Sequence, residues 1–126
     1  MADDDWVLVR TAIVAVLAEE GRRLQKHDES LIFGANGRLM RYGDVASWLT
    51  VSRFGETDPL IETTVAVAGT AGSYRLSADI GTHDGEVLAE LEDHGAARTV
   101  DEMVGRLRQF LNDNAELLER MAKARS

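Results

Sequence analysis

Residues 60–92, LIETTVAVAGTAGSYRLSADIGTHDGEVLAELE, carry the strongest structural signal in the chain. Three runs within this segment, 60–68, 73–80 and 86–92, are separated by short glycine-containing stretches that favour turns. In each run apolar and polar residues alternate, which is the pattern of a strand with one buried and one solvated face. The segment therefore predicts an antiparallel meander of three strands.

The alternation also assigns residues to the two faces of this meander. The face toward the core is expected to carry Ile61, Thr63, Val65, Val67, Tyr74, Leu76, Ala78, Ile80, Val87, Ala89 and Leu91. The opposite face is expected to carry Glu62, Thr64, Arg75, Ser77, Asp79, Glu86, Glu90 and Glu92. Asp79 and Glu90 are expected to face each other across neighbouring strands. The meander thus has one core face and one polar, mainly acidic face.

Further strands are expected before the meander. The runs 31–34 and 38–42 are apolar enough to form two strands. Asn36-Gly37 lies between them and predicts a tight hairpin turn, because both residues accept positive φ. Residues 48–54 are rich in aromatic and β-branched residues and predict another strand.

The C-terminal segment predicts a long amphipathic helix. Thr99 and Glu102 fit a capping box, and the helix is expected to reach Lys123, a length of about 35 Å at 1.5 Å per residue. Its apolar stripe consists of Val100, Val104, Leu107, Leu111, Leu118 and Met121, with a gap at Asn114. A polar residue in such a seam can set the oligomeric state. We therefore predict a homodimer contact made by Leu111, Asn114, Leu118 and Met121.

Together these elements predict an α+β fold in a single domain that covers residues 1–126. A length of 126 residues with 44% hydrophobic content is typical of one domain with one core. The expected order is an N-terminal helix at about 5–26, an antiparallel sheet of five to six strands and the long C-terminal helix. Both helices are expected to cover one face of the sheet.

The formal net charge of −8 is concentrated in the middle of the chain. Between residues 55 and 94 there are nine acidic residues, and Arg75 is the only lysine or arginine. The remainder of the chain is balanced. An acidic field disfavours contact with nucleic-acid phosphates and favours a basic protein partner.

No recognised catalytic, cofactor-binding or metal-binding motif is present. The chain has no cysteine, and its serines do not occur in a nucleophile motif. Two segments place a histidine beside carboxylates, His27-Asp28-Glu29 and His83-Asp84-Gly85-Glu86. Neither has the ligand spacing of a calcium or zinc site, so ordinary turns are the better interpretation. We predict no catalytic residue, no cofactor and no metal.

The sequence also predicts a cytoplasmic protein without a membrane span. The longest apolar run, residues 12–18, is far shorter than the roughly 20 residues that cross a bilayer. The first residues are acidic, whereas a signal peptide begins with basic residues. The absence of cysteine is consistent with a reducing compartment.

The first functional hypothesis is a non-enzymatic module that binds a basic protein partner. Its size and charge are similar to those of acidic toxin inhibitors and small secretion chaperones. The expected contact residues are Glu62, Arg75, Asp79, Glu86, Glu90 and Glu92. One alternative is a small-molecule-binding or enzymatic domain with a pocket between the first helix and the sheet, lined by Trp48, Phe54, Tyr74 and Phe110. Another is a structural subunit that assembles through its terminal helix.

Overall fold

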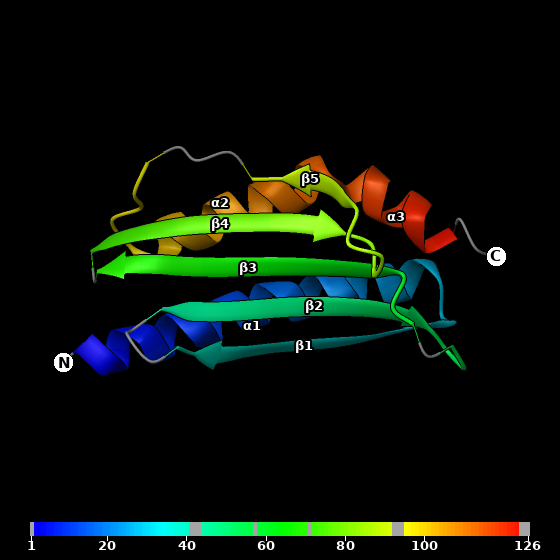
Figure 1. Cartoon of the computed structure of the whole chain (residues 1–126), viewed down its shortest axis with the longest axis horizontal. Coiled ribbons are helices and arrows are strands. Elements are labelled where there is room, and N and C mark those ends of the chain that lie inside the picture. Colours follow the sequence, from blue (N-terminus) through cyan, green and yellow to red (C-terminus); the bar gives the residue numbers. More distant parts are fainter. Residues whose placement is uncertain (1, 41–43, 57, 71, 92–94, 124–126) are drawn as a thin grey trace.

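A computed structural model describes residues 2–40, 44–56, 58–70, 72–91 and 95–123. The chain has an α+β fold, as the sequence predicts (Figure 1). Its elements, in order, are α1 (Ala2–His27), β1 (Leu31–Leu39), β2 (Val45–Arg53), β3 (Ile61–Thr70), β4 (Ser73–Gly81), β5 (Val87–Glu90), α2 (Val100–Asp113) and α3 (Ala115–Lys123).

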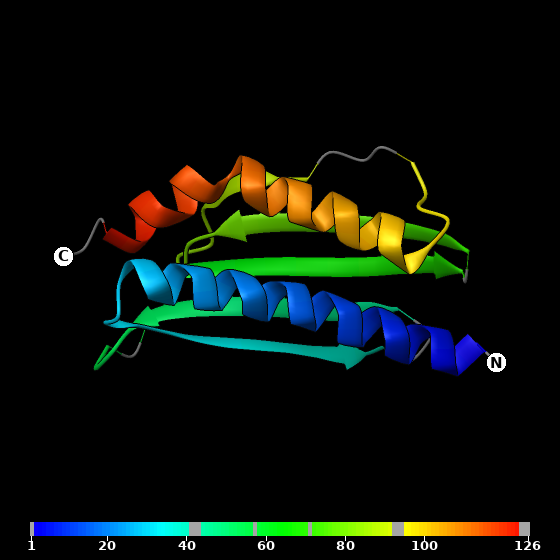
Figure 2. The ribbon, with the colours of Figure 1, turned by 180° about the vertical axis from the view of Figure 1, so that it is seen from behind.

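The five strands form one antiparallel sheet in the order β1-β2-β3-β4-β5. Each strand therefore pairs with the next strand of the chain, and the predicted meander forms its β3–β5 half. All helices lie on one face of the sheet, with α1 beside α2 and α3 (Figure 2). The view of Figure 1 shows the other face, which no described helix covers. The expectation that the helices pack on one face is confirmed.

The core lies between the sheet and the helices. Along β3, every second residue from Ile61 to Val67 is buried, namely Ile61, Thr63, Val65 and Val67. The helices contribute fully buried side chains to the same cluster, among them Ile13, Leu17 and Leu107. The alternation that the sequence shows is thus the alternation of burial in the structure.

The predicted hairpin turn at Asn36-Gly37 is wrong. β1 continues through both residues and pairs with β2 without interruption. Gly37 instead allows α1 to approach the strand, because a Cβ at this position would lie 2.8 Å from Val14 Cγ2 and 2.7 Å from Ser47 Oγ. The Asn36 side chain accepts the Gly37 N–H at 2.8 Å. The two strands expected at 31–34 and 38–42 are therefore one strand, and residues 41–43 lie outside the described residues.

Two boundaries of the remaining strands also differ from the prediction. β2 begins at Val45, three residues earlier than expected, and ends before Phe54. In β5 the expected burial of Val87 is wrong, since this side chain is 52% exposed. The β4–β5 register shifts between Ile80 and Gly81, which displaces Val87 from the alternation. Ala89 and Leu91 pack against the core as expected.

The long C-terminal helix is divided in two at Asn114. This residue ends α2 with φ −109° and ψ 15°, and its Nδ2 donates to the Phe110 carbonyl at 2.8 Å. Its own carbonyl accepts the N–H of Leu118 at 3.0 Å, within the first turns of α3. The gap in the apolar stripe is therefore the position where the chain changes direction, and the helical run is bent over the sheet (Figure 2).

Side-chain bonds fix both ends of the helix layer. The predicted N-cap of α2 is confirmed, since Thr99 Oγ1 accepts the Glu102 N–H at 3.0 Å. Glu102 Oε2 in turn accepts the N–H of Arg98 at 3.0 Å. At the other end, Arg53 Nη2 donates to the Ala122 carbonyl at 2.7 Å and so ties α3 to the sheet.

No helix in the described part of the chain combines the length and the apolar composition that a membrane span requires.

Candidate partner-binding surface

The sheet face opposite the helices is called here the open face. It consists of Ile32, Gly34, Asn36, Arg38, Ala46, Trp48, Thr50, Ser52, Glu62, Thr64, Ala66, Ala68, Arg75, Ser77, Asp79 and Glu90. The strand registers align Asn36, Trp48, Thr64, Asp79 and Glu90 in one row across all five strands. These side chains lie on the same face because each residue is directly opposite the next one on the adjacent strand.

Three carboxylates gather at the β3–β5 side of this face. Asp79 and Glu90 are directly opposed across β4 and β5, which confirms the expected pairing. Glu62 is opposite Gly81, two residues from Asp79, and is therefore its diagonal neighbour. Directly opposed side chains have Cβ atoms about 4.5–5.5 Å apart, and diagonal neighbours are about 7–8 Å apart. The three acids thus form a compact anionic patch.

A shallow hollow of about 220 Å³ borders this patch. Thr64, Ala66 and Ser77 contribute small side chains, while Asp79 and Glu90 supply the acidic groups. Because the small residues leave room beside the carboxylates, a basic side chain from another molecule can enter the hollow and lie against both acids.

Apolar side chains lie on the other half of the open face. Trp48 is half-buried in the row, between Asn36 and Thr64, and Ile32 is 44% exposed near one end of the face. Phe54 is 77% exposed and directly follows β2, with its N–H bonded to the Ser30 carbonyl at 2.7 Å. This bond extends the β1–β2 ladder and places Phe54 close to Ile32. Sequence reasoning assigned Trp48 to a pocket, although its place among Ala46, Thr50 and Ser52 in the alternation could have assigned it to the polar face.

The other predicted contact residues are more dispersed. Arg75 lies on the open face four residues from Asp79 along β4, about 13 Å away at 3.3 Å per residue, and not among the acids. Glu86 is exposed in the β4–β5 turn, where its carbonyl accepts the Thr82 N–H at 3.0 Å. Glu92 lies outside the described residues.

The predicted oligomer contact residues are mostly occupied within their own chain. Leu111 and Leu118 are 3% and 0% exposed and belong to the core. Met121 is half-buried against that core, and the Asn114 amide is bonded to Phe110. Association of two copies through this segment stays a prediction.

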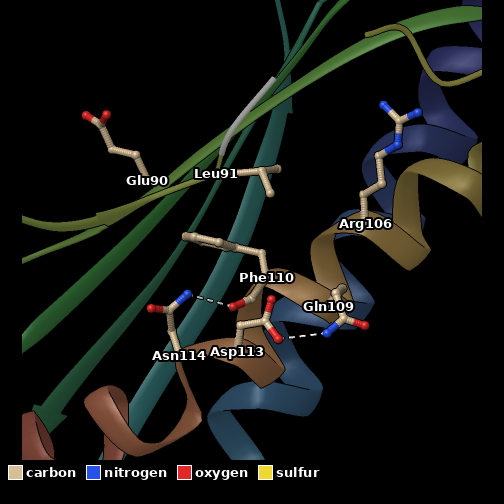
Figure 3. A pocket seen from close by; sticks show the side chains of 7 residues that line it. All are labelled: Glu90, Leu91, Arg106, Gln109, Phe110, Asp113 and Asn114. Atoms are coloured by element: carbon tan, nitrogen blue, oxygen red, sulfur yellow. Dashed lines mark hydrogen bonds between the residues drawn. The ribbon is translucent and has the colours of Figure 1, made fainter. Parts of the chain in front are cut away.

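A pocket of about 310 Å³ lies between β5 and α2 (Figure 3). Its polar side chains largely bond to neighbours in the same chain. Gln109 Nε2 donates to Asp113 Oδ1 at 2.7 Å, and Arg106 donates to the Gly95 carbonyl and to Glu102. The Glu90 carboxylate points away from the other lining side chains (Figure 3). The pocket therefore offers few polar groups that converge on a ligand.

The aromatic-lined pocket expected between the first helix and the sheet does not form, because its four residues lie apart. Tyr74 is buried edge-on against Trp6, with ring centroids 5.7 Å apart. Phe110 is also in the core, whereas Trp48 and Phe54 lie outside it. The buried core between the helices and the sheet consists mostly of aliphatic side chains.

The histidines of the two clusters contact different parts of the chain: His27 reaches from the last turn of α1 to α3, whereas His83 contacts a neighbour in the β4–β5 turn. His27 Nε2 lies 3.1 Å from Glu119 Oε1, and His83 Nε2 lies 3.1 Å from Asp84 Oδ1. Among the described residues, no group of three or more histidine, aspartate and glutamate side chains is arranged to hold a metal ion.

Carboxyl groups with shifted pKa values occur in the helix layer and its turns. Side-chain and backbone hydrogen bonds from Ser30, followed by the Arg53 guanidinium, lower the pKa of Asp28. The backbone N–H of Arg98, together with Arg106, lowers the pKa of Glu102. Both groups stabilise the fold by bonding in their charged form.

Comparisons with known proteins add no relative: no family model matches the chain, nor does any curated protein or solved structure.

Proposed function

We propose that this chain is a non-enzymatic protein-binding module that holds a basic protein partner on the open face of its sheet. The observation that carries this proposal is the direct opposition of Asp79 and Glu90, with Glu62 diagonal to them. Like charges placed opposite each other cost a sheet about 0.2–1 kcal/mol per pair. Basic side chains of a partner would remove that repulsion and gain charge-assisted hydrogen bonds.

The shape of the patch favours several cationic side chains over a single bound ion. The carboxylates come from three strands and do not converge within the described residues on one metal position. Nucleic acids are disfavoured because their phosphates would meet the same negative field. A basic protein segment can instead distribute its charges over the patch.

The apolar half of the open face supports a protein partner. Trp48 lies two strands from Asp79 in the same row, about 10 Å away at 4.8 Å per strand. Tryptophan is enriched among the residues that dominate binding energy at protein interfaces. Arginine suits both halves of the surface, because its planar guanidinium binds carboxylates bidentately and stacks on aromatic rings.

Toxin inhibition and secretion escort are the two protein-binding roles that fit this size and charge. A cytoplasmic setting for this binding is proposed from the absence of cysteine in the sequence. The structural-subunit alternative differs in its contact, which would be the C-terminal helices.

The direct test is affinity capture from native-cell extract with three matched baits. The first is the unchanged chain and the second carries Glu62→Lys with Glu90→Lys. The third, a control, carries Glu29→Lys with Glu116→Lys, two exposed acids outside the open face. Both double variants change the net charge by the same amount, so a general charge effect would weaken both equally.

The expected result is a lysine- and arginine-rich protein bound stoichiometrically by the unchanged chain and by the control, and lost from the open-face variant. Raising the salt concentration should release this partner, because rim charges are screened. A partner that binds all three baits equally, or that is lost only from the control, would contradict the proposal.

A further inference from the structure

The two edges of the sheet differ in how well they are protected from further pairing. β5 has four residues, a register shift beside it and the carboxylate of Glu90. Short length, irregular register and charge are common protections of an edge strand. β1, the opposite edge, has nine residues and pairs with β2 in nine consecutive steps. Its sequence contains no proline and only one charge, Arg38.

The outward backbone groups of β1 follow from the ladder that joins it to β2. The Phe54 N–H bonds to the Ser30 carbonyl at one end, and the Met40 N–H bonds to the Asp44 carbonyl at the other. In an antiparallel pair such bonded residues recur at every second position. The even-numbered residues of β1 therefore bond to β2, and the N–H and C=O groups of Phe33 and Ala35 point to the free edge.

The flank of α1 beside this edge is largely uncharged. Val7, Thr11, Val14 and Ala18 recur at spacings of four, three and four residues, which places them on one side of the helix. Val7 is 39% exposed and Thr11 is also exposed. This stripe includes residues of the apolar run 12–18 that the core of the chain does not bury.

Open space adjoins both features. A hollow of about 530 Å³ is lined by Arg10, Thr11, Val14, Ala15 and Ala18 of α1 together with Asn36 and Gly37 of β1. In both ribbon views, β1 is the outermost strand on its side of the sheet (Figures 1 and 2). The backbone edge and the α1 stripe are therefore accessible together.

We propose that two copies of this chain associate through their β1 edges, antiparallel about a two-fold axis at Ala35. Ala35 then pairs with its counterpart, Phe33 lies opposite Gly37 of the second copy, and the two sheets become one continuous sheet. The α1 stripes of the two copies lie side by side above the junction. Such an isologous contact closes on itself, as most homodimers do.

Charge favours a second copy as the occupant of this edge. Residues 6–18 and 31–40 contain no acidic residue and two basic ones, Arg10 and Arg38, although the whole chain has a net charge of −8. The two copies can therefore approach along the side from which the acidic groups are absent. In the proposed register Arg38 lies opposite Ile32 of the second copy, so the two paired strands oppose no like charges.

The test is the mass in solution of the full-length chain and three variants, measured by sedimentation. Ala35→Pro removes an N–H that does not bond to β2, so the edge strand should tolerate the proline. The same substitution removes the hydrogen bonds at the centre of the proposed junction. Thr11→Glu places a charge on the exposed α1 stripe and keeps the test valid if the proline variant does not fold. Asn112→Glu adds the same charge at an exposed position of α2 and serves as the control.

The unchanged chain and the control should sediment at twice the 13.8 kDa chain mass. Both edge variants should sediment as folded monomers, with the circular dichroism of the unchanged chain. A monomeric unchanged chain at the highest soluble concentration would overturn the proposal. A dimer that survives Thr11→Glu but is lost with Met121→Asp would also overturn it and assign the contact to the C-terminal helices.

Discussion

The two faces of the sheet are built from the same strands, yet they carry different classes of residue. On the helix-covered face of β3, Ile61, Val65 and Val67 are almost completely buried. On the open face the intervening residues include Glu62 and Thr64, and the neighbouring strands add Trp48 and opposed carboxylates. The covered face accounts for the stability of the fold. The open face contains an arrangement that stability alone does not explain, because opposed carboxylates repel each other.

The two faces should differ most in the stability lost on alanine substitution, and the adjacent residues Ile61 and Glu62 provide the comparison. Ile61→Ala should lower the free energy of unfolding by about 2–5 kcal/mol, since it leaves a cavity in the core. Glu62→Ala should change it by no more than about 0.5 kcal/mol, as is usual for surface positions. Urea denaturation of both variants measures the contrast. Equal losses of stability in the two variants would show that the open face also contributes to the stability of the fold.

Two glycines of β1 provide a smaller and sharper contrast. A Cβ at Gly37 would lie 2.7 Å from Ser47 Oγ, whereas the nearest side-chain atom to a Cβ at Gly34 is Thr50 Oγ1 at 3.5 Å. Gly37→Ala should therefore cost about 1–3 kcal/mol through overpacking against α1. Gly34→Ala faces the open side and should be neutral or stabilising in the same urea experiment. Destabilisation by Gly34→Ala alone would contradict the assignment of faces.

Removing a carboxylate from the open face is expected to stabilise the fold, whereas the Ile61 and Gly37 substitutions above destabilise it. Glu90→Gln should raise the free energy of unfolding by up to about 1 kcal/mol, because it removes the repulsion with Asp79. The same variant should bind a basic partner more weakly. Thermal unfolding at low ionic strength measures the first effect. A loss of stability would mean that the Glu90 carboxylate has a favourable partner within the chain.

The smallest expected effect is the response to acid. The pKa of Asp28 and the pKa of Glu102 are both lowered in the folded chain by bonds to their charged forms. Their contribution to stability is therefore complete at neutral pH and is lost as the pH falls below their ordinary values of 3.8 and 4.5. Asp28→Asn should flatten the dependence of the urea midpoint on pH in this range. An unchanged pH profile would contradict this role.

The sequence predicts best where local pattern and burial agree. The meander, the two faces of β3 and β4 and the Asp79–Glu90 pair all follow from alternation, because a single buried face constrains the register. The N-cap at Thr99 follows from its local bond to the Glu102 N–H.

The errors occur where a distant contact determines the local structure. Asn36-Gly37 has the composition of a turn, but the approach of Val14 from α1 requires a glycine within a continuous strand. Nothing in the local sequence reports that approach. The irregular register beside β5 likewise depends on strand pairing, so the exposure of Val87 was not predictable from alternation.

The central claim, that a basic partner binds the open face, is tested most directly by the two tryptophans of the chain. Trp6 is buried in the core against Tyr74, whereas Trp48 lies on the open face in the row that contains Asp79 and Glu90. The indole N–H resonances of both can be followed by nitrogen-15 NMR during titration with a short arginine-rich peptide. A saturable shift of Trp48, with Trp6 unmoved and the shift abolished by Glu62→Lys with Glu90→Lys, is the predicted result. A shift of Trp6 alone, or no saturable shift of either indole, would contradict the claim.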